Sequence, residues 1–376
     1  MKTKSIAIPA GLPAGRDIFG ALAAALGCEL CVYEPALIGR WNAGEDGALA
    51  EIFSGHPVLL VTPTNIKLNA RLLRVADGRV GALASVSTGT DHVDFAALEE
   101  SGIPFFHAPG VNARSVAEYV ISALPLYFDA DRLLAGEIRA GIIGYGHVGR
   151  ALGSMLRELG MDFRFYDPLI EPEEGFSPLS ETLQADFISF HVPLTRAGEH
   201  ATLGMVNDSY LAPVRPGSLI INTARGKIMS EESYKRVTRD FPTLMDVFPE
   251  EPPTGEMLER AACVSPHIAG YNYSARAGGS RATALAYASF VGLPLETIPP
   301  LPEVRYDHYV IDFLSSESER LKNDPASFAA RRSHYPDRGD FSACPGEKYR
   351  AALDPFRWKV LETFAGTAVE NIRSPA

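Results

Sequence analysis

The stretch Ile138-Arg-Ala-Gly-Ile-Ile-Gly-Tyr-Gly-His-Val-Gly149 is the most informative part of this chain of 376 residues. A β-type run at 138–143 passes directly into three glycines, and an amphipathic helix is predicted to begin near His147. Gly144 permits a tight turn, Gly146 lets the backbone approach a pyrophosphate, and Gly149 allows the helix to pack closely on the strand. The free amides and the positive end of the helix dipole favour phosphate binding. We therefore predict a dinucleotide site made of Gly144, Gly146, His147, Val148 and Gly149.

An acidic residue further along the chain indicates which dinucleotide binds. Asp167 ends the next predicted strand, 18 residues after Gly149, near the spacing of about 20 expected for the acid that binds a ribose. A carboxylate accepts hydrogen bonds from ribose hydroxyls but repels the 2′-phosphate of NADP, so NAD is the predicted cofactor. The alternative is that Asp167 and Pro168 merely start a turn.

Short β-type runs alternate with helical patterns through the first 290 residues, which is typical of parallel sheets covered by helices on both faces. The strands predicted in the first series are 5–8, 30–33, 58–61, 83–86 and 104–107, and those in the second are 138–143, 162–166, 187–191, 218–222, 243–246 and 263–265. A long helix at 112–128 connects the two series, and Pro125 is expected to kink it or to end its regular part.

These patterns predict an α/β protein with two doubly wound parallel-sheet domains, one a Rossmann NAD-binding domain and the other flavodoxin-like, followed by a smaller α+β C-terminal domain. The expected boundaries are 1–110, completed by a returning helix near 275–290, then 111–274, and finally 300–376 after a Pro-rich break. The last segment carries too many aromatic residues for a disordered extension.

The composition argues against several classes of protein. A formal net charge of -11 disfavours a nucleic-acid groove, and no apolar run approaches the roughly 20 residues that span a bilayer. The N-terminal residues lack the features of a secretory signal, so a cytoplasmic protein is expected. Four cysteines are too few for a disulfide framework. We interpret Cys28 and Cys31, which form one C-x-x-C, as buried structural cysteines, and we predict no metal site.

Five segments form an ordered signature over residues 1 to about 290. They are Ser87-Thr-Gly-Thr-Asp-His-Val-Asp94, Gly144-Tyr-Gly-His-Val-Gly149, Ile221-Asn-Thr-Ala-Arg-Gly226, Asp246-Val-Phe-Pro-Glu-Glu-Pro252 and Ser265-Pro-His-Ile-Ala269. In order and spacing they resemble the D-2-hydroxyacid dehydrogenase family. The resemblance implies an NAD-dependent enzyme that passes a hydride between nicotinamide and the C2 carbon of a small 2-hydroxy acid, with residues 1–110 as the substrate-binding domain.

Carried over residue by residue, the resemblance assigns the catalytic roles to Arg225, Glu251 and His267. His267 is expected to accept the hydroxyl proton in oxidation, with Glu251 paired to it, and Arg225 to bind the substrate carboxylate through its planar fork of donors. Taken alone, each residue has another interpretation: a loop or core histidine, a solvated turn residue and the cap of a strand end. Their positions at the carboxyl ends of predicted strands, where ligands gather in such sheets, favour the catalytic interpretation.

Six further positions match binding residues in the resemblance. They are Asp246, Ala224 and Gly270 near the nicotinamide, and Thr64, Ser87 and Tyr271 at the substrate. Hydroxyls and backbone amides at the substrate positions can bind phosphate or carboxylate oxygens. For Thr64 and Ser87 a structural role in a turn is an equal alternative.

Within the family, the segment His267-Ile-Ala-Gly-Tyr271, the chain length and the C-terminal unit are most similar to the erythronate-4-phosphate dehydrogenases, enzymes of pyridoxal phosphate synthesis. This similarity implies 4-phospho-D-erythronate as the substrate. That branch carries basic residues where this chain has Pro63 and Gly278. Lys67 and Arg71 are candidates to supply the missing charge, although a solvated helix face is the alternative for each.

The C-terminal segments 328–335 and 338–341 are similar to the dimerisation domain of the same branch, so a homodimer is expected. Packing of this region on its own chain is the alternative. Arg331 and Arg332 are candidates to reach a neighbouring active site.

Two other functions stay open. One is a dehydrogenase for another acid, such as 3-phosphoglycerate, D-lactate or glyoxylate. The other is a non-enzymatic NAD sensor, similar to the corepressor branch of the family, in which NAD controls association. Retention of Arg225, Glu251 and His267 favours an enzyme.

Overall fold

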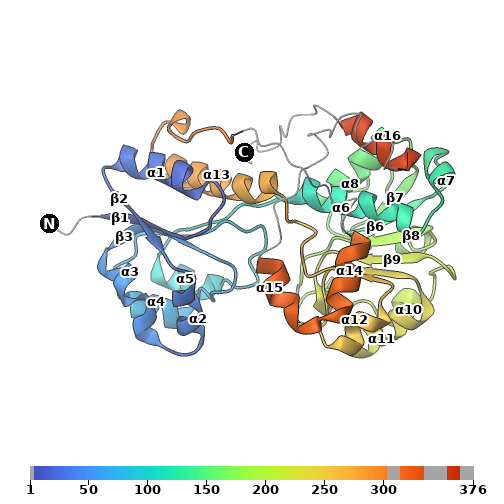
Figure 1. Ribbon diagram of the computed structural model, residues 1–376, viewed down its shortest axis with the longest axis horizontal. Coiled ribbons are helices and arrows are strands. Elements are labelled where there is room, and N and C mark those ends of the chain that lie inside the picture. The colour runs from blue at the N-terminus through green and yellow to red at the C-terminus, as the bar shows by residue number, and fades with distance from the viewer. Residues whose placement is uncertain (1–3, 303–313, 334–353, 365–376) are drawn as a thin grey trace. The chain divides into compact units, whose positions relative to one another are not determined.

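A computed structural model describes residues 4–302, 314–333 and 354–364 of the chain (Figure 1). The chain divides into two compact units. Among the described residues, the first unit contains 4–111 and 273–302, and the second contains 112–272, 314–333 and 354–364.

The first unit is built on a five-stranded parallel sheet. Its strands are β1 (Ser5–Pro9), β2 (Glu29–Tyr33), β3 (Pro57–Thr62), β4 (Leu83–Ser85) and β5 (Phe105–Phe106), in the order β2-β1-β3-β4-β5. This is the flavodoxin-like order that the sequence predicts, with the strand order reversing between β1 and β3. The sequence of β3, Pro-Val-Leu-Leu-Val-Thr, is almost entirely apolar because both faces of a parallel sheet are covered.

Helices cover both faces of this sheet, and each face has its own apolar core (Figure 1). They are α1 (Gly15–Leu26), α2 (Ala36–Asn42), α3 (Ala50–Ser54), α4 (Ala70–Ala76), α5 (Phe95–Ser101) and α13 (Tyr273–Phe290), with the 3-10 helices η1 (Asp46–Leu49) and η4 (Leu295–Thr297). α1 and α13 lie on one face, where Phe19, Leu22, Ala284 and Tyr287 share a core with apolar residues of β1 and β3. α13 is thus the returning helix expected near 275–290.

The second unit is built on a six-stranded parallel sheet. Its strands are β6 (Ala140–Ile143), β7 (Phe163–Tyr166), β8 (Phe187–Phe190), β9 (Leu219–Asn222), β10 (Thr243–Met245) and β11 (Cys263–Val264), in the order β11-β10-β9-β8-β6-β7. β7 pairs with one side of β6, and the chain then crosses to the other side, where β8, β9, β10 and β11 follow in order. Beyond β7 a third strand is reduced to a single parallel bridge between Phe165 and Phe176. The predicted strands of both sheets are confirmed to within two residues at each end.

The helices of the second unit pack on both sides of its sheet. They are α6 (Ala113–Ala123), α7 (Ala130–Leu134), α8 (His147–Glu158), α9 (Leu179–Thr182), α10 (Asp208–Leu211), α11 (Glu231–Asp240) and α12 (Gly255–Arg260), with 3-10 helices η2 (Leu124–Leu126) and η3 (Gly226–Ile228). α6 gives way to η2 at Leu124, so Pro125 ends the regular helix as predicted.

The described C-terminal helices pack on the second unit of their own chain. They are α14 (Leu314–Asn323), the 3-10 helix η6 (Pro325–Ser327), α15 (Phe328–Ser333) and α16 (Pro355–Phe364). Leu321 and Phe328 join the core around β10, while Leu314 and Phe356 join the core beneath α6 and α8. The Ser318 hydroxyl also accepts a hydrogen bond from the Val264 amide of β11 at 3.1 Å. That residues 300–376 form a dimerisation domain stays a prediction.

The prediction that Cys28 and Cys31 are buried is wrong. Cys31 is exposed and Cys28 is only partly buried. The reason is the place of β2 at the edge of the first sheet, where its side chains are less covered than those of a central strand. In the described ranges no helix has the length and apolar character needed to cross a membrane.

Replacing Leu321 with Ala tests whether α14 belongs to the second unit. The Leu321 side chain is fully buried, and removing it should lower the free energy of unfolding by about 2–5 kcal/mol. The measurement is the thermal midpoint of the variant against that of Leu295→Ala, a control whose side chain is 46% exposed. Equal midpoints for the two variants would contradict the packing of α14 on this unit.

Candidate active site

The three glycines after β6 each meet a different steric condition. Gly144 has a φ of +89°, and a Cβ there would collide with the carbonyl of His191. A Cβ at Gly149 would overlap the Gly144 carbonyl, so the start of α8 can approach the strand only without a side chain. A Cβ at Gly146 would have no neighbour within 4 Å. The open space at Gly146, before the first turn of α8, fits a pyrophosphate approaching the backbone.

Asp167 braces this glycine turn. It follows β7, and its Oδ2 accepts a hydrogen bond from the Tyr145 amide at 2.8 Å. Its Oδ1 accepts from the Leu169 amide at 3.0 Å, so the carboxylate also starts a turn. Each oxygen of a carboxylate has a second lone pair, which leaves acceptor sites for ribose hydroxyls. The turn and the dinucleotide interpretations of Asp167 are therefore compatible.

Asp246, which directly follows β10, is the buried hydrogen-bond acceptor for the loop that follows β11. Its side chain is 1% exposed. Its two oxygens accept three hydrogen bonds, from Ser265 Oγ at 2.6 Å, Ile268 N at 2.7 Å and Ala269 N at 3.0 Å. Burial raises the pKa of this carboxyl, against the lowering effect of His267 and of the three donors. Asp246 thus fixes the residues on both sides of His267. Its predicted contact with the nicotinamide carboxamide stays a prediction.

His267 is held in an uncommon backbone conformation with a defined partner. Its φ is 60°, in the left-handed region that non-glycine residues seldom adopt. Its Nδ1 lies 2.8 Å from Oε2 of Glu251, which confirms the expected pairing. Because an ionised carboxylate can only accept, Nδ1 carries the proton and Nε2 of the neutral ring is left as an acceptor. The arrangement can therefore take a proton at Nε2.

Glu251 is prepared to stabilise a charged imidazole. Burial raises the pKa of this carboxyl, but the hydrogen bond and charge of His267, the charge of Arg332 and the Phe248 amide together lower it below its usual range. The Phe248 amide donates to Oε1 at 3.3 Å. Glu251 is consequently ionised at neutral pH.

Arg225 lies in a turn that touches the same loop. The side chain of Asn222, the last residue of β9, accepts from the Ala224 amide at 3.1 Å and donates to the Arg225 carbonyl at 3.2 Å. The guanidinium donates to the Ala224 carbonyl at 2.8 Å. A Cβ at Gly226 would overlap the Phe248 carbonyl, so the two backbones are in close contact. The structure therefore joins the turn of Arg225 to the loop of Glu251 and, through it, to His267.

One residue at this edge of the sheet escaped the sequence analysis. His191 follows β8, the strand beside β6, and its Nε2 lies 2.9 Å from the Ser189 hydroxyl. Burial lowers the pKa of His191 to about 3, so the ring is neutral. The signal that could have found it is its position: a polar residue directly after the strand at which the strand order reverses.

The other predicted positions are divided between the units. Gly270 packs against the Asn112 side chain, and the Tyr271 amide donates to the Ile268 carbonyl at 2.8 Å, both within the second unit. Thr64 and Ser87 belong to the first unit, after the neighbouring strands β3 and β4. Thr64 is exposed, whereas the Ser87 hydroxyl donates to the Gly89 carbonyl at 2.8 Å, as a turn residue does.

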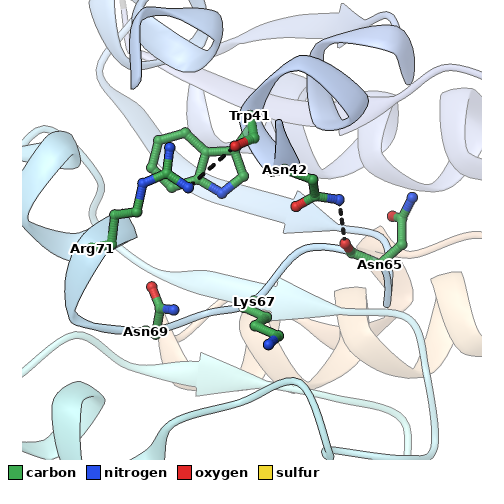
Figure 2. A pocket seen from close by; sticks show the side chains of 6 residues that line it. All are labelled: Trp41, Asn42, Asn65, Lys67, Asn69 and Arg71. Atoms are coloured by element: carbon green, nitrogen blue, oxygen red, sulfur yellow. Dashed lines mark hydrogen bonds between the residues drawn. The ribbon is translucent and has the colours of Figure 1, made fainter. Parts of the chain in front are cut away.

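The two candidates for a compensating charge, Lys67 and Arg71, line a polar pocket with Trp41, Asn42, Asn65 and Asn69 (Figure 2). The Arg71 guanidinium stacks 4.0 Å above the Trp41 ring and pairs with Asp46 at 2.6 Å. Arg71 is therefore already engaged, and Lys67 is the exposed candidate of the two.

Comparisons with known proteins identify the family. Residues 132–269 match the sequence profile of the D-isomer specific 2-hydroxyacid dehydrogenase NAD-binding domain. Over 81% of this chain and 87% of the relative, the sequence is 32% identical to the erythronate-4-phosphate dehydrogenase of Cellvibrio japonicus. It is 31% identical to that of Tolumonas auensis over 78% of this chain and 86% of the relative. The chain belongs to the D-isomer specific 2-hydroxyacid dehydrogenases.

Solved structures of this kind share the fold. A 3-phosphoglycerate dehydrogenase of Entamoeba histolytica with bound NAD superposes with a TM-score of 0.62 at 21% identity, covering 80% of this chain and 99% of the other. For the D-lactate dehydrogenase of Aquifex aeolicus with NAD and lactic acid, the TM-score is 0.60 at 22% identity, covering 79% and 97%. The two predicted parallel-sheet domains, the enzyme class and the NAD cofactor are confirmed, and the α+β C-terminal domain stays a prediction.

Two glycine variants of this NAD-dependent dehydrogenase should behave differently. Gly146→Ala adds a methyl group to open space, so the thermal midpoint should stay unchanged while NADH binds about tenfold or more weakly, a loss of about 1.4 kcal/mol or more. Gly149→Ala forces an overlap with backbone and should destabilise the fold by about 1–3 kcal/mol. Calorimetric titration with NADH and thermal melting measure the two effects. Undiminished NADH affinity in Gly146→Ala would refute the assignment of the phosphate site.

We expect the neutral ring of His191 to make the folded protein less stable in acid. Because the folded pKa is lowered to about 3, the contribution of His191 to stability is present above its unfolded pKa of about 6.5 and is lost as the pH falls below it. Between pH 6.5 and 5.5 the loss is on the order of 1 kcal/mol.

The corresponding measurement is the denaturant midpoint at pH 7.5 and at pH 5.5. His191→Gln should lose less stability over this interval than the wild-type protein, while other titrating groups contribute equally to both. Identical losses in the two proteins would show that the ring is not held neutral.

Proposed function

We propose that this enzyme oxidises the C2 hydroxyl of 4-phospho-D-erythronate to the 2-oxo acid, 3-hydroxy-2-oxo-4-phosphobutanoate, with NAD as the hydride acceptor, and that it serves pyridoxal phosphate synthesis. The observation that carries the chemical part of the proposal is the Glu251–His267 pair at 2.8 Å, on a loop fixed by Asp246 and joined to the turn of Arg225. The similarity to erythronate-4-phosphate dehydrogenases carries the choice of substrate.

His267 acts as the base in this proposal. As the C2 hydrogen leaves with its electron pair, the hydroxyl proton passes to Nε2, and the carbonyl forms. The imidazolium that results is stabilised by the ionised carboxylate of Glu251. In the reverse reaction the same nitrogen returns the proton. When bound, NAD supplies the hydride acceptor.

Arg225 binds the substrate carboxylate. Its guanidinium offers several donors in one plane, which suits a carboxylate and also polarises the adjacent carbonyl as it develops. The contact of Gly226 with Phe248 supports this role, because it ties Arg225 to the loop that orients the base.

We assign the cofactor to the second unit. Gly144, Gly146 and Gly149, with His147 and Val148 at the start of α8, hold the pyrophosphate, and Asp167 binds the adenosine ribose. Ala224, Asp246 and Gly270 lie near the nicotinamide in this proposal. We assign the substrate-binding role to the first unit with Thr64 and Ser87, and to Tyr271 of the second. Lys67, exposed after β3, is our candidate for the phosphate contact.

The proposal extends to the assembly and the compartment. We infer a homodimer that works in the cytoplasm, on the similarity to erythronate-4-phosphate dehydrogenases. Sedimentation of the full chain gives the oligomeric state directly, and a monomer at micromolar concentration would remove this part of the proposal.

A substrate panel with NAD and NADP tests the reaction. NADH formation is measured with 4-phospho-D-erythronate, 3-phosphoglycerate, D-lactate and glycolate. The first should give the highest kcat/KM, and NAD should be preferred to NADP. His267→Asn should lower kcat by about 10²–10⁴-fold without changing NADH affinity. His200→Asn, an exposed histidine of the same unit, is the control.

Three outcomes contradict parts of the proposal. Faster turnover of another acid removes the substrate but keeps the catalytic pair. NAD binding without turnover of any acid indicates a sensor in place of an enzyme. Undiminished turnover in His267→Asn eliminates the assigned base.

A further inference from the structure

A charged residue of the C-terminal segment reaches the Glu251–His267 pair. Arg332, in α15, places Nη1 3.8 Å from Oε2 of Glu251. This is the same oxygen that lies 2.8 Å from Nδ1 of His267. The side chains of all three residues are 24–31% exposed, so water screens their charges only in part. Arg332 thus lies near Glu251 of its own chain, and its reach to a neighbouring active site stays a prediction.

The position of Arg332 is set by contacts of its own helix. Phe328, at the start of α15, is buried, and its ring meets that of Phe248 edge-on with centroids 6.0 Å apart. The amide of Phe248 donates to Glu251, so one residue anchors both the helix and the carboxylate.

Arg331 holds the other side of α15. Its guanidinium donates to the Ser327 hydroxyl at 2.7 Å and pairs with the nearly buried Glu317 of α14 at 3.3 Å. Arg331 is therefore structural. The contacts of Phe328 and Arg331 together fix α15, and Arg332 of the same helix extends to Glu251.

We propose that Arg332 is a positioning residue of the catalytic pair: its charge acts on Oε2 of Glu251, the oxygen that pairs with His267, and thereby sets the pH range in which His267 can act as a base. The inference rests on the proposed function for the role of His267, but the electrostatic claim concerns this chain alone. It makes the C-terminal segment a part of the catalytic site as well as of the fold.

Charged side chains of both signs lie around His267. The groups that interact with the ring are Glu251, the buried Asp246 and, through Glu251, Arg332. Carboxylates favour the charged form of a neighbouring imidazole, and a cation beside one of those carboxylates offsets part of that effect. Oxidation requires the neutral ring.

Removing the Arg332 charge should therefore raise the pH at which His267 loses its proton. In Arg332→Gln we expect the midpoint of the His267 imidazole titration, followed by NMR on the histidine-labelled enzyme with bound NAD, to rise by roughly half a pH unit or more. His267→Asn assigns the resonance. The acid limb of kcat/KM for oxidation should move upward by the same amount.

Two variants separate charge from structure. Arg332→Lys keeps a positive charge beside Glu251 and should restore most of the wild-type midpoint. Arg320→Gln removes an exposed arginine from α14, away from Glu251, and should leave the midpoint unchanged.

An unmoved His267 midpoint in Arg332→Gln overturns the proposal, whatever the activity. So does a rise in KM for the phosphorylated acid without movement of the acid limb, since that result identifies Arg332 as a substrate contact. Because the NMR titration needs no substrate, it remains decisive even if the substrate panel rejects 4-phospho-D-erythronate.

Discussion

The buried carboxylate of Asp246 is the interaction on which the active-site loop depends. It directly follows β10 and accepts hydrogen bonds from Ser265, Ile268 and Ala269, on either side of His267. A peptide segment that follows a short edge strand has few neighbours to satisfy its amides, and these donors would otherwise be left without acceptors in a buried site. The same three bonds hold His267 at a positive φ, a conformation that an unsupported loop would abandon. Asp246 thus fixes the backbone that positions the His267 imidazole.

The second sheet brings together polar groups that are separated by more than a hundred residues in the sequence. Parallel strands deliver their carboxyl ends to one edge, where β6 contributes the glycine turn, β7 Asp167, β8 His191, β9 the turn of Arg225 and β10 the loop of Glu251. Close backbone approaches then connect neighbouring turns. Gly144 lies against His191, and Gly226 lies against Phe248. Glycine is required at these places by contact with another backbone.

The C-terminal helices pack on this nucleotide-binding unit and contact the loop that contains Glu251. α14 and α15 pack on the core around β10, and the ring of Phe328 rests on Phe248 in the loop that carries Glu251. These contacts join the C-terminal segment to the loop that contains Glu251. Two adjacent arginines have different partners: Arg331 pairs with Glu317 of α14, and Arg332 lies near Glu251 of the loop.

The local elements and the candidate chemical groups follow from the sequence. Apolar runs predict the strands of both sheets, glycine spacing predicts the turn after β6, Pro125 predicts the end of α6, and an ordered signature gives the candidates Arg225, Glu251 and His267. Those features depend on short-range sterics and on patterns that repeat along the chain. The exposure of Cys31, the hydrogen bonds of Asp246 to the His267 loop and the approach of Arg332 to Glu251 became visible only in the folded chain. Each of these depends on which distant segments come into contact, and residue pattern alone does not encode the partner of a long charged side chain.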